Sequence, residues 1–308
     1  MRKCSSLIKY VSMNTNNKLV VTIENRRDIV AMANAGADEI CLSLDGFSIT
    51  ALHTFSLEEL KVCIDNAADF HIGVSVLVNK LFHERELEDL RQLMHALKEV
   101  SITSIYFADL AVLRVAQQLQ MVSKLIYMPD TMMTSPQDAQ FYLQLGLDKV
   151  AVSPLLTKQE TIEIIRQAKE VVVPVYGHMV MSFSYRKLLT SWKNTFGYAE
   201  NVDDTQNLYL VEEKRDGKMP VFENEEGTLI YTDYVLDSFD ILKEFQQAQA
   251  PVYFMTGVFL NRLAYIEAVH LTKSILNGEE VKDSVEAYKQ KFKEYTFLEG
   301  YYNEKTVR

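Results

Sequence analysis

Strand-like and helix-like patterns alternate along the chain from Leu19 to His178, and this alternation is what most restricts its fold. Apolar runs rich in Val and Ile are separated by amphipathic segments, which gives seven strand–helix units. Such alternation predicts a parallel sheet with crossover helices. Strands this apolar suit the interior of a (β/α) TIM-like barrel, complete or incomplete. An open doubly wound sheet is the alternative. The strand runs are LVVTIEN, ADEICLSL, HIGVSVLVN, ITSIYFAD, KLIYMPD, LDKVAVSP and VVVPVYGH.

Helix ends within this region carry clear signals. Ser56 and Glu59 have the spacing of a capping box, and Gly36 stands where a helix would end with a left-handed residue. The segment from Ser56 to Phe70 is therefore predicted to be a helix, as is the segment that ends at Gly36.

The alternation stops after Trp192. Residues Asn207–Asp233 read as two or three antiparallel strands turned at Asp216-Gly217 and Glu226-Gly227, and Pro251–Leu260 restores a buried strand, the eighth. We expect an acidic, β-rich insertion before the last barrel strand. The expected organisation is a tail (1–17), the main barrel (18–196), the insertion with a helix (197–250), and the last strand with two C-terminal helices (251–308).

The charge is concentrated in this insertion. Of the net charge of −10, residues Gly197–Ala250 contribute −9, because they hold 13 acidic and 4 basic residues. Such a segment is a poor surface for nucleic-acid phosphates. A solvated acidic lobe is the plain interpretation, and a docking surface for a basic partner is the alternative.

Several mechanisms are excluded by residue spacing. The glycines nearest to each other lie ten residues apart, so no dinucleotide-binding, Walker A or nucleophile-elbow motif is present. The three cysteines, Cys4, Cys41 and Cys63, include no C-x-x-C pair, which predicts a reducing, cytoplasmic setting. No apolar run is long enough to span a bilayer, and the N-terminus lacks a secretory signal. Met13 is an alternative start.

Polar residues at strand ends are the first candidates for a site, because these ends face the mouth of a parallel barrel. For each one the alternative role is the N-cap of the next helix. That role suits Asp109 and Ser153 best, whereas no helix begins directly after Asn79 or His178. The candidates are Asn25, Asp45, Asn79, Asp109, Asp130, Thr131, Ser153 and His178.

Metal-binding patterns are weak. His83-Glu84 begins like a zinc-protease motif, but Leu87 stands where the second histidine belongs. A solvated histidine at a helix start is therefore the favoured reading of His83, and we expect no metal site in this chain. Cys41 and Cys63 are expected to be buried, apolar-like residues.

A basic segment follows His178. Ser182–Lys193 contains three cations and no acid, interleaved with hydroxyls. At a barrel mouth it could hold a carboxylate or phosphate, and Arg186 could do so with two parallel hydrogen bonds. We expect Asn79, Asp109 and Asp130 to converge there. The alternative is that Arg186 pairs with an acid of the insertion. The site candidates are Asn79, His83, Asp109, Asp130, Thr131, His178, Ser184, Tyr185 and Arg186.

This stretch resembles the signature of peptidase family U32, the collagenase-like family. The matching residues are Tyr176-Gly177, Phe183–Lys187 and Leu188–Ser191, with agreement in order at Asn79, His83-Glu84, Asp109, Asp130–Thr134 and the terminal FLEGYYNE. The likeness is strongest to short members that occur beside a longer paralogue. Both signature cysteines are replaced, by Val180 and Lys187, and the signature glycine is replaced by Tyr185.

The resemblance implies a function and its partners. Relatives with the cysteines hold an iron–sulfur cluster and support oxygen-independent hydroxylation of ubiquinone precursors or RNA. This chain lacks four thiolates, so any cluster would belong to a partner. We expect a factor in tRNA wobble-uridine 5-hydroxylation that works with a longer U32 paralogue, contacts tRNA through that complex and binds a small carboxylate such as prephenate. The alternatives are a collagenase-like peptidase and a non-catalytic subunit. No membrane association is expected, and homo-oligomerisation stays open.

Overall fold

The computed structural model describes residues 17–129, 132–197, 208–213 and 217–303. Eight parallel strands in these ranges close into a barrel, because β13 pairs with β1 on one side and with β7 on the other. The (β/α) barrel prediction is confirmed, and the open sheet is excluded by this pairing. The barrel strands are β1 (Lys18–Ile23), β2 (Glu39–Ser43), β3 (Gly73–Val78), β4 (Ile105–Phe107), β5 (Leu125–Tyr127), β6 (Lys149–Ala151), β7 (Val171–Gly177) and β13 (Val252–Met255).

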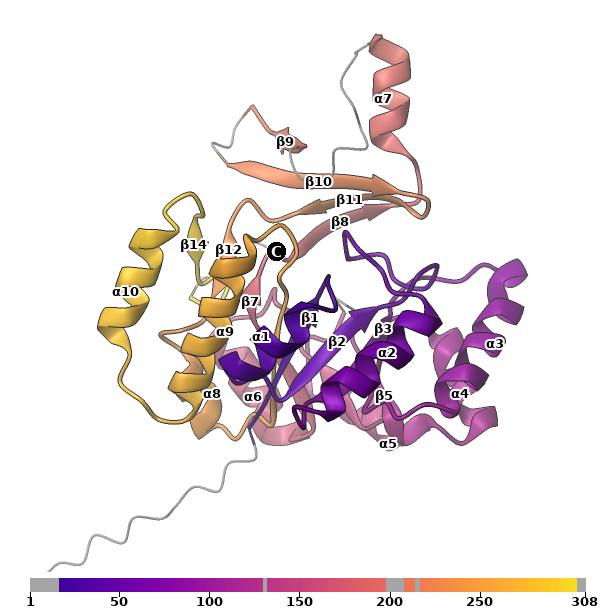
Figure 1. The fold of residues 1–308 in the computed structure, drawn as a ribbon, viewed down its shortest axis with the longest axis horizontal. Helices are drawn as coiled ribbons and strands as arrows, with labels where there is room; N and C mark the ends of the chain where they lie inside the picture. Colours follow the sequence, from indigo (N-terminus) through magenta and orange to yellow (C-terminus); the bar gives the residue numbers. More distant parts are fainter. Residues whose placement is uncertain (1–16, 130–131, 198–207, 214–216, 304–308) are drawn as a thin grey trace, which may run out of the picture.

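Helices surround the barrel and bury their apolar faces against it (Figure 1). The capping box at Ser56 and Glu59 is confirmed, and so is the left-handed Gly36 that ends α1. The barrel helices are α1 (Asp28–Ala35), α2 (Leu57–Ala68), α3 (Leu87–Lys98), α4 (Leu110–Leu119), α5 (Pro136–Gln144), α6 (Lys158–Ala168), α8 (Leu242–Gln247) and α9 (Arg262–Leu276), with the short 3₁₀ turns η1 (Glu84–Glu86) and η2 (Val122–Lys124). Of these described helices, none has the length and apolarity to cross a membrane.

The barrel interior changes character along its axis. Its middle is an apolar cluster that includes Val20, Leu77, Tyr106 and Phe254. At the amino end of the strands, the buried Glu39 carboxylate accepts a hydrogen bond from Lys18 Nζ at 2.7 Å and another from the Ser75 hydroxyl. A buried carboxylate needs such partners. The polar lower end is thus filled by its own residues.

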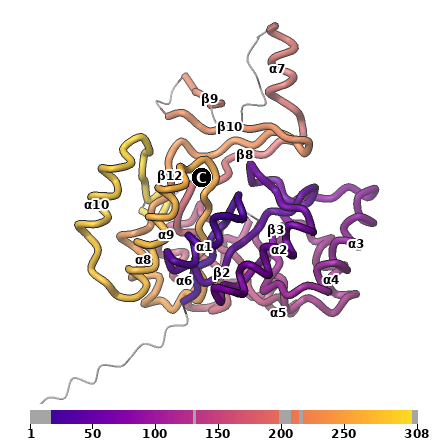
Figure 2. The backbone as a smooth tube through the Cα atoms, in the orientation of Figure 1, coloured from indigo at the N-terminus to yellow at the C-terminus, as the bar shows by residue number. Residues whose placement is uncertain are grey.

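A second, smaller sheet lies across the carboxyl end of the barrel, as Figures 1 and 2 show. Its strand order in the described residues is β8 (Val180–Ser184), β11 (Gly227–Tyr231), β10 (Lys218–Asn224), β9 (Tyr209–Val211), all antiparallel. We call these four strands the lid sheet. The helix α7 (Leu188–Phe196) follows β8 and projects away from the barrel.

The lid sheet begins earlier than the expected boundary at residue 196. Its first strand, β8, comes directly after β7, so residues 180–196 belong in space to the excursion and not to the barrel. The sequence boundary followed the change in charge, which starts only after Gly197. Pairing between β8 and β11, about 45 residues apart, leaves no local signal in the chain.

The chain returns to the barrel through β12 (Val235–Asp237), which pairs antiparallel with the end of β7. β14 (Phe297–Leu298) adds to β12, and α10 (Lys282–Lys291) packs against α9. The Tyr302 hydroxyl donates to the Pro174 carbonyl at 2.6 Å. The C-terminal segment therefore supports the β7 side of the barrel.

Gly177 is the residue where β7 meets β13. Its φ is +116°, and a Cβ atom there would lie 2.2 Å from the Thr256 carbonyl oxygen. Gly197 also has a positive φ, of +70°, but nothing lies within 4 Å of its Cβ position. We expect Gly197→Ala to cost about 1 kcal/mol of unfolding free energy from backbone strain alone, and Gly177→Ala to cost clearly more because the clash adds to it. Urea denaturation of both variants measures the difference, and equal costs would contradict it.

Candidate functional site at the carboxyl end of the barrel

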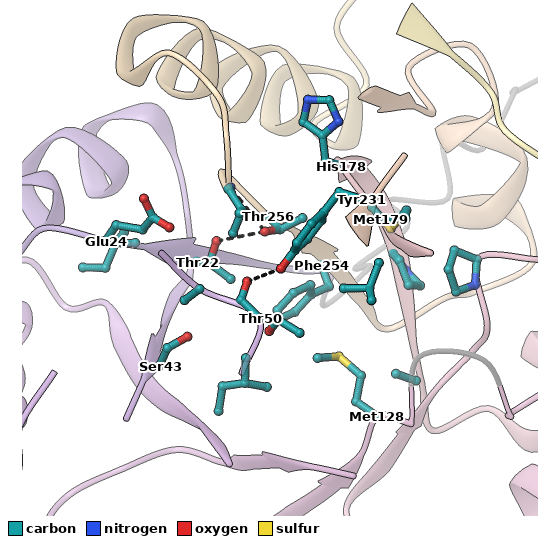
Figure 3. Close-up of a pocket in the computed structure, with 18 of the residues that line it drawn as sticks. Thr22, Glu24, Ser43, Thr50, Met128, His178, Met179, Tyr231, Phe254 and Thr256 are labelled. Carbon is teal, nitrogen blue, oxygen red and sulfur yellow. Dashed lines mark hydrogen bonds between the residues drawn. The ribbon is translucent and has the colours of Figure 1, made fainter. Parts of the chain in front are cut away.

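A cavity lies between the barrel mouth and the lid sheet (Figure 3). It has a volume of about 80 Å³. The strand ends give it a polar side, and the barrel core and lid give it an apolar one. Its polar lining residues are Thr22, Glu24, Ser43, Thr50, His178, Tyr231 and Thr256, and its apolar ones include Leu77, Met128, Val152, Met179, Val180 and Phe254.

The lid is held over this cavity by packing and by hydrogen bonds. Phe222, Leu229 and Tyr231 of the lid form a buried cluster with Val258 of the barrel rim. The Tyr231 hydroxyl donates to the Thr50 carbonyl at 2.7 Å (Figure 3). The cavity is therefore closed from above by side chains of the insertion.

Lys80 makes a second attachment of the lid. Its ammonium group lies 2.7 Å from Glu226 of the lid and 2.8 Å from Glu86 of η1. Burial by itself would lower the pKa of Lys80, but the two carboxylates outweigh it and raise the pKa. The lysine therefore stays charged and joins the end of β3 to the lid.

Asn79 fixes the loop that carries Thr50. It is buried, its Oδ1 accepts from the Ile49 amide at 3.0 Å, and its Nδ2 donates to the Thr50 hydroxyl at 3.0 Å. The structure thus places Asn79 behind the cavity wall, where it positions Thr50. Asn79 is not among the residues that line the cavity.

Glu24 lies at the mouth where three hollows meet. One carboxylate oxygen accepts a hydrogen bond from the Leu52 amide at 3.1 Å. Burial raises the pKa of Glu24, the Leu52 amide opposes this rise, and the charge of Asp28 adds to it. A carboxyl group with a raised pKa at a barrel mouth can give or take a proton more readily near neutral pH than an exposed one.

His178 lies between β7 and β8, where the chain passes from the barrel to the lid. It contacts Thr232, which lies between β11 and β12, where the chain returns. Its Nδ1 lies 2.8 Å from the Thr232 carbonyl oxygen, so Nδ1 carries the proton, and the Met179 amide donates to the Thr232 hydroxyl. Burial lowers the pKa of His178, which the neighbouring carbonyl groups and Asp233 only partly offset. The imidazole is therefore neutral near pH 7.

An outer chamber of about 690 Å³ lies beside the cavity and shares Glu24 and His178 with it. Lys218 and Asp233 line it from the insertion, and Glu294 and Tyr295 line it from the C-terminal segment. Glu24 and His178 thus stand at the boundary between the small cavity and the larger chamber.

Other predicted strand-end residues have structural roles. Asp109 caps α4 by accepting from the Ala111 amide, and it also accepts from the Phe82 amide, each at 2.8 Å. Ser153 accepts from the Leu155 amide, and Asn25 accepts from the Arg27 amide. Asp45 contacts Thr54 at the surface. The N-cap alternative therefore describes Asp109. The predicted residues Asp130 and Thr131 lie outside the described residues.

Four further candidates, His83, Ser184, Tyr185 and Arg186, lie on or near the lid and do not line the cavity. The Tyr185 ring lies 5.6 Å from that of His83, and its hydroxyl donates to the Leu81 carbonyl at 3.3 Å. Ser184 accepts from the Arg186 amide. Arg186 is exposed and lines none of the hollows described above. The structure therefore does not bring His83, Ser184, Tyr185 or Arg186 together with His178.

The basic segment does hold a carboxylate, but it belongs to the protein itself. Glu223 accepts from the amides of Leu189 and Thr190 at the start of α7, at 2.8 and 3.2 Å. Lys187 pairs with Glu225 at 2.9 Å. An acid at a helix N-terminus satisfies amides that would otherwise lack partners. This end of α7 is therefore filled by the lid.

The sequence analysis missed several residues that line the cavity, although the two-residue period of the strands places them on the inward face. In β1 the inward positions are Val20, Thr22 and then Glu24, whereas Asn25 points elsewhere. In β2 they are Cys41 and Ser43. Counting inward from the strand core would have selected these residues. Thr50 and Tyr231 come from distant segments and carry no such signal.

The cysteines do not fit an iron–sulfur cluster. Cys41 lies in the barrel interior and Cys63 on α2, both buried as expected, and burial raises the pKa of both thiols. Cys4 lies outside the described residues. Within the described ranges no three His, Cys, Asp or Glu side chains group as a metal site.

These features define a (β/α) barrel with a lid over a mouth cavity, and comparison with known proteins gives its family. The model of peptidase family U32 matches residues 24–304, so the chain belongs to this family. It is 26% identical to the tRNA hydroxylation protein P2 of Bacillus subtilis (strain 168) over 281 residues, which cover 89% of this chain and 90% of that protein.

Similar solved structures include the U32 peptidase Mk0906 and phosphoribosyl anthranilate isomerase from Thermus thermophilus. The first has a TM-score of 0.48 at 14% identity and covers 78% of this chain and 92% of its own. The second has a TM-score of 0.49 at 8% identity and covers 84% and 99%.

The lid attachment at Tyr231 is testable. Tyr231→Phe removes the hydroxyl that donates to Thr50, so we expect a loss of about 1 kcal/mol and faster amide hydrogen exchange in β8 and β11. Tyr185→Phe is the matched control, because its hydroxyl makes only a long, exposed contact. If both variants exchange like the wild type, the Tyr231 contact does not hold the lid.

The burial of His178 predicts a pH dependence. In the unfolded chain its imidazole binds a proton near pH 6.5, but the folded protein resists this because burial lowers the pKa. The unfolded state therefore binds more protons below pH 6.5, and the free energy of unfolding should fall as the pH drops below that value. We expect a flatter profile for His178→Gln and an unchanged one for the exposed control His270→Gln. Urea titrations from pH 8 to 5 measure this, and parallel profiles for all three proteins would contradict it.

Proposed function

We propose that this protein is a factor in tRNA hydroxylation, at C5 of wobble uridine, and that it acts with a longer U32 paralogue that carries an iron–sulfur cluster. The observation that carries the proposal is the likeness to tRNA hydroxylation protein P2, which spans nine-tenths of both chains. A likeness of this extent covers the barrel, the lid sheet and the C-terminal helices together.

The absence of cluster ligands supports a partner. The two described cysteines are buried on separate elements, and Val180 and Lys187 stand at the signature cysteine positions. Hydroxylation of a uracil carbon requires a redox step, which these side chains do not supply. The cluster chemistry is therefore assigned to the paralogue, and binding or proton transfer is assigned to this chain.

The covered cavity supports a role in holding a reacting group. It places a carboxyl group of raised pKa and a neutral imidazole at one boundary beneath the lid sheet. Proteolysis lacks such support, since among the described residues no serine or cysteine side chain hydrogen-bonds to His178.

Gene deletion tests the proposal. We expect 5-hydroxyuridine-derived nucleosides in tRNA to fall on deletion of this gene, and equally on deletion of the paralogue, as measured by mass spectrometry of digested tRNA. The wild-type gene should restore them, whereas Glu24→Ala or Thr22→Val should restore them poorly because both side chains line the cavity. Glu58→Gln on the exposed face of α2 is the control and should restore them fully. Unchanged nucleosides in a strain without a second hydroxylation pathway would refute the function.

A further inference from the structure

The residues that line the mouth cavity include no lysine and no arginine in the part of the chain that the structure describes. The two titratable groups with shifted pKa values are Glu24, whose pKa burial raises, and His178, whose pKa burial lowers. Both shifts favour uncharged forms. Among the described residues, the space therefore holds no positive charge that could pair with an anion.

Cations near the mouth are used elsewhere or lie outside the cavity. Lys80 is held between Glu86 and Glu226. Lys218 lines the outer chamber, where Glu24, Asp233 and Glu294 outnumber it. A carboxylate placed in the cavity would lose its hydration without gaining an opposite charge, which is costly.

Two polar side chains of the cavity wall, Ser43 and Glu24, have hydrogen-bonding capacity that the described protein groups do not fill. Ser43 is 4% exposed, and within the described ranges its hydroxyl has no hydrogen bond. Glu24 uses one carboxyl oxygen for the Leu52 amide, and the other has no hydrogen bond within those ranges. Both side chains line the cavity and have hydrogen-bonding capacity that the described protein groups do not use, so both are available to a ligand.

The opposite side of the cavity is apolar. Met128 and Phe254 face the group formed by Thr22, Thr50 and Ser43 (Figure 3). A volume of about 80 Å³ limits the enclosed part of a ligand to about one small ring. The wall thus matches a flat group with an apolar face and a hydrogen-bonding edge.

We propose that the cavity binds an uncharged ring of the pyrimidine-base type and excludes carboxylates. The unpaired Glu24 oxygen accepts a hydrogen bond from a ring N–H, and the Ser43 hydroxyl donates to a ring carbonyl. The choice of uracil as the ring rests on the proposed function, whereas the preference for a neutral ring rests on the cavity alone. The ring could come from an unpaired nucleotide of an RNA strand or from a free nucleoside.

Four probes distinguish these sources and the competing ligand. They are a short RNA stem-loop with one unpaired uridine, the same RNA with 3-methyluridine, free uridine, and prephenate as the small carboxylate. The methyl group removes the N–H whose hydrogen bond Glu24 would accept. We therefore expect about tenfold weaker binding of the methylated RNA by calorimetry, the effect of losing one hydrogen bond. Prephenate should not bind. If free uridine binds as strongly as the RNA, the ligand is a nucleoside. If the RNA binds more tightly than free uridine, the ligand is a nucleotide of an RNA strand.

Variants test the assigned contacts. Glu24→Ala should abolish the difference between uridine and 3-methyluridine RNA, and Ser43→Ala should weaken both equally, while Glu58→Gln should match the wild type. The melting temperature of each variant shows whether it is folded. If Glu24→Ala does not fold, Ser43→Ala still tests the assigned contacts. The proposal is overturned if neither RNA nor nucleoside binds, if methylation has no effect, or if prephenate binds and Ser43→Ala weakens it.

This outcome is separate from that of the gene deletion. If tRNA nucleosides fall in the deletion strain but the cavity binds prephenate, the proposed function stands and this inference fails. If the cavity binds uridine but the nucleosides do not change, the ligand assignment stands and the proposed function fails.

Discussion

Closure of the barrel by β13 is the constraint on which the rest of the structure depends. β1 to β7 form consecutive parallel pairs, and only the insertion of β13 between β7 and β1 satisfies the two remaining edges. The chain leaves the barrel after β7, forms the lid sheet, and returns to place β13. The antiparallel contact of β12 with the end of β7 brings it back at the mouth. The lid consequently lies over the carboxyl ends of the strands, where a (β/α) barrel presents its site.

Each end of the barrel interior contains a buried glutamate, and the two glutamates differ in their hydrogen-bond partners. At the amino end, Glu39 accepts hydrogen bonds from Lys18 and Ser75, which fill the space. At the carboxyl end, Glu24 has a single backbone donor and no cation in hydrogen-bonding contact within the described residues, and burial raises its pKa. One end is thus completed by the protein, and the other leaves hydrogen-bonding capacity for a ligand. This contrast, rather than the presence of a hollow alone, marks the mouth as the site.

Sequence patterns predicted the barrel because each strand and helix carries its own periodicity and caps, as at Ser56 and Gly36. The site was predicted less well for two physical reasons. A single-residue shift reverses the direction of a strand side chain, which selected Asn25 instead of Glu24. Asp45 lies two residues beyond Ser43, past the end of β2, where its side chain is at the surface. The partners of the basic segment, Glu223 and Glu225, come from a hairpin about 35 residues away, and no local pattern encodes that contact. The binding roles expected for Asn79, Tyr185 and Arg186 stay predictions, while their contacts are structural.

The residues at the substituted signature positions show how the lid depends on this chain's own sequence. Val180 begins β8 and packs against the cluster that joins lid to rim, Lys187 pairs with Glu225 within the lid, and Tyr185 reaches from the lid to Leu81 of the barrel. Val180 thus packs between the lid and the barrel rim, and Lys187 forms an ion pair within the lid. Restoring cysteines at Val180 and Lys187 would remove an apolar contact and an ion pair while supplying two ligands where four are needed. The lid therefore covers the cavity with side chains that are not cluster ligands at these positions.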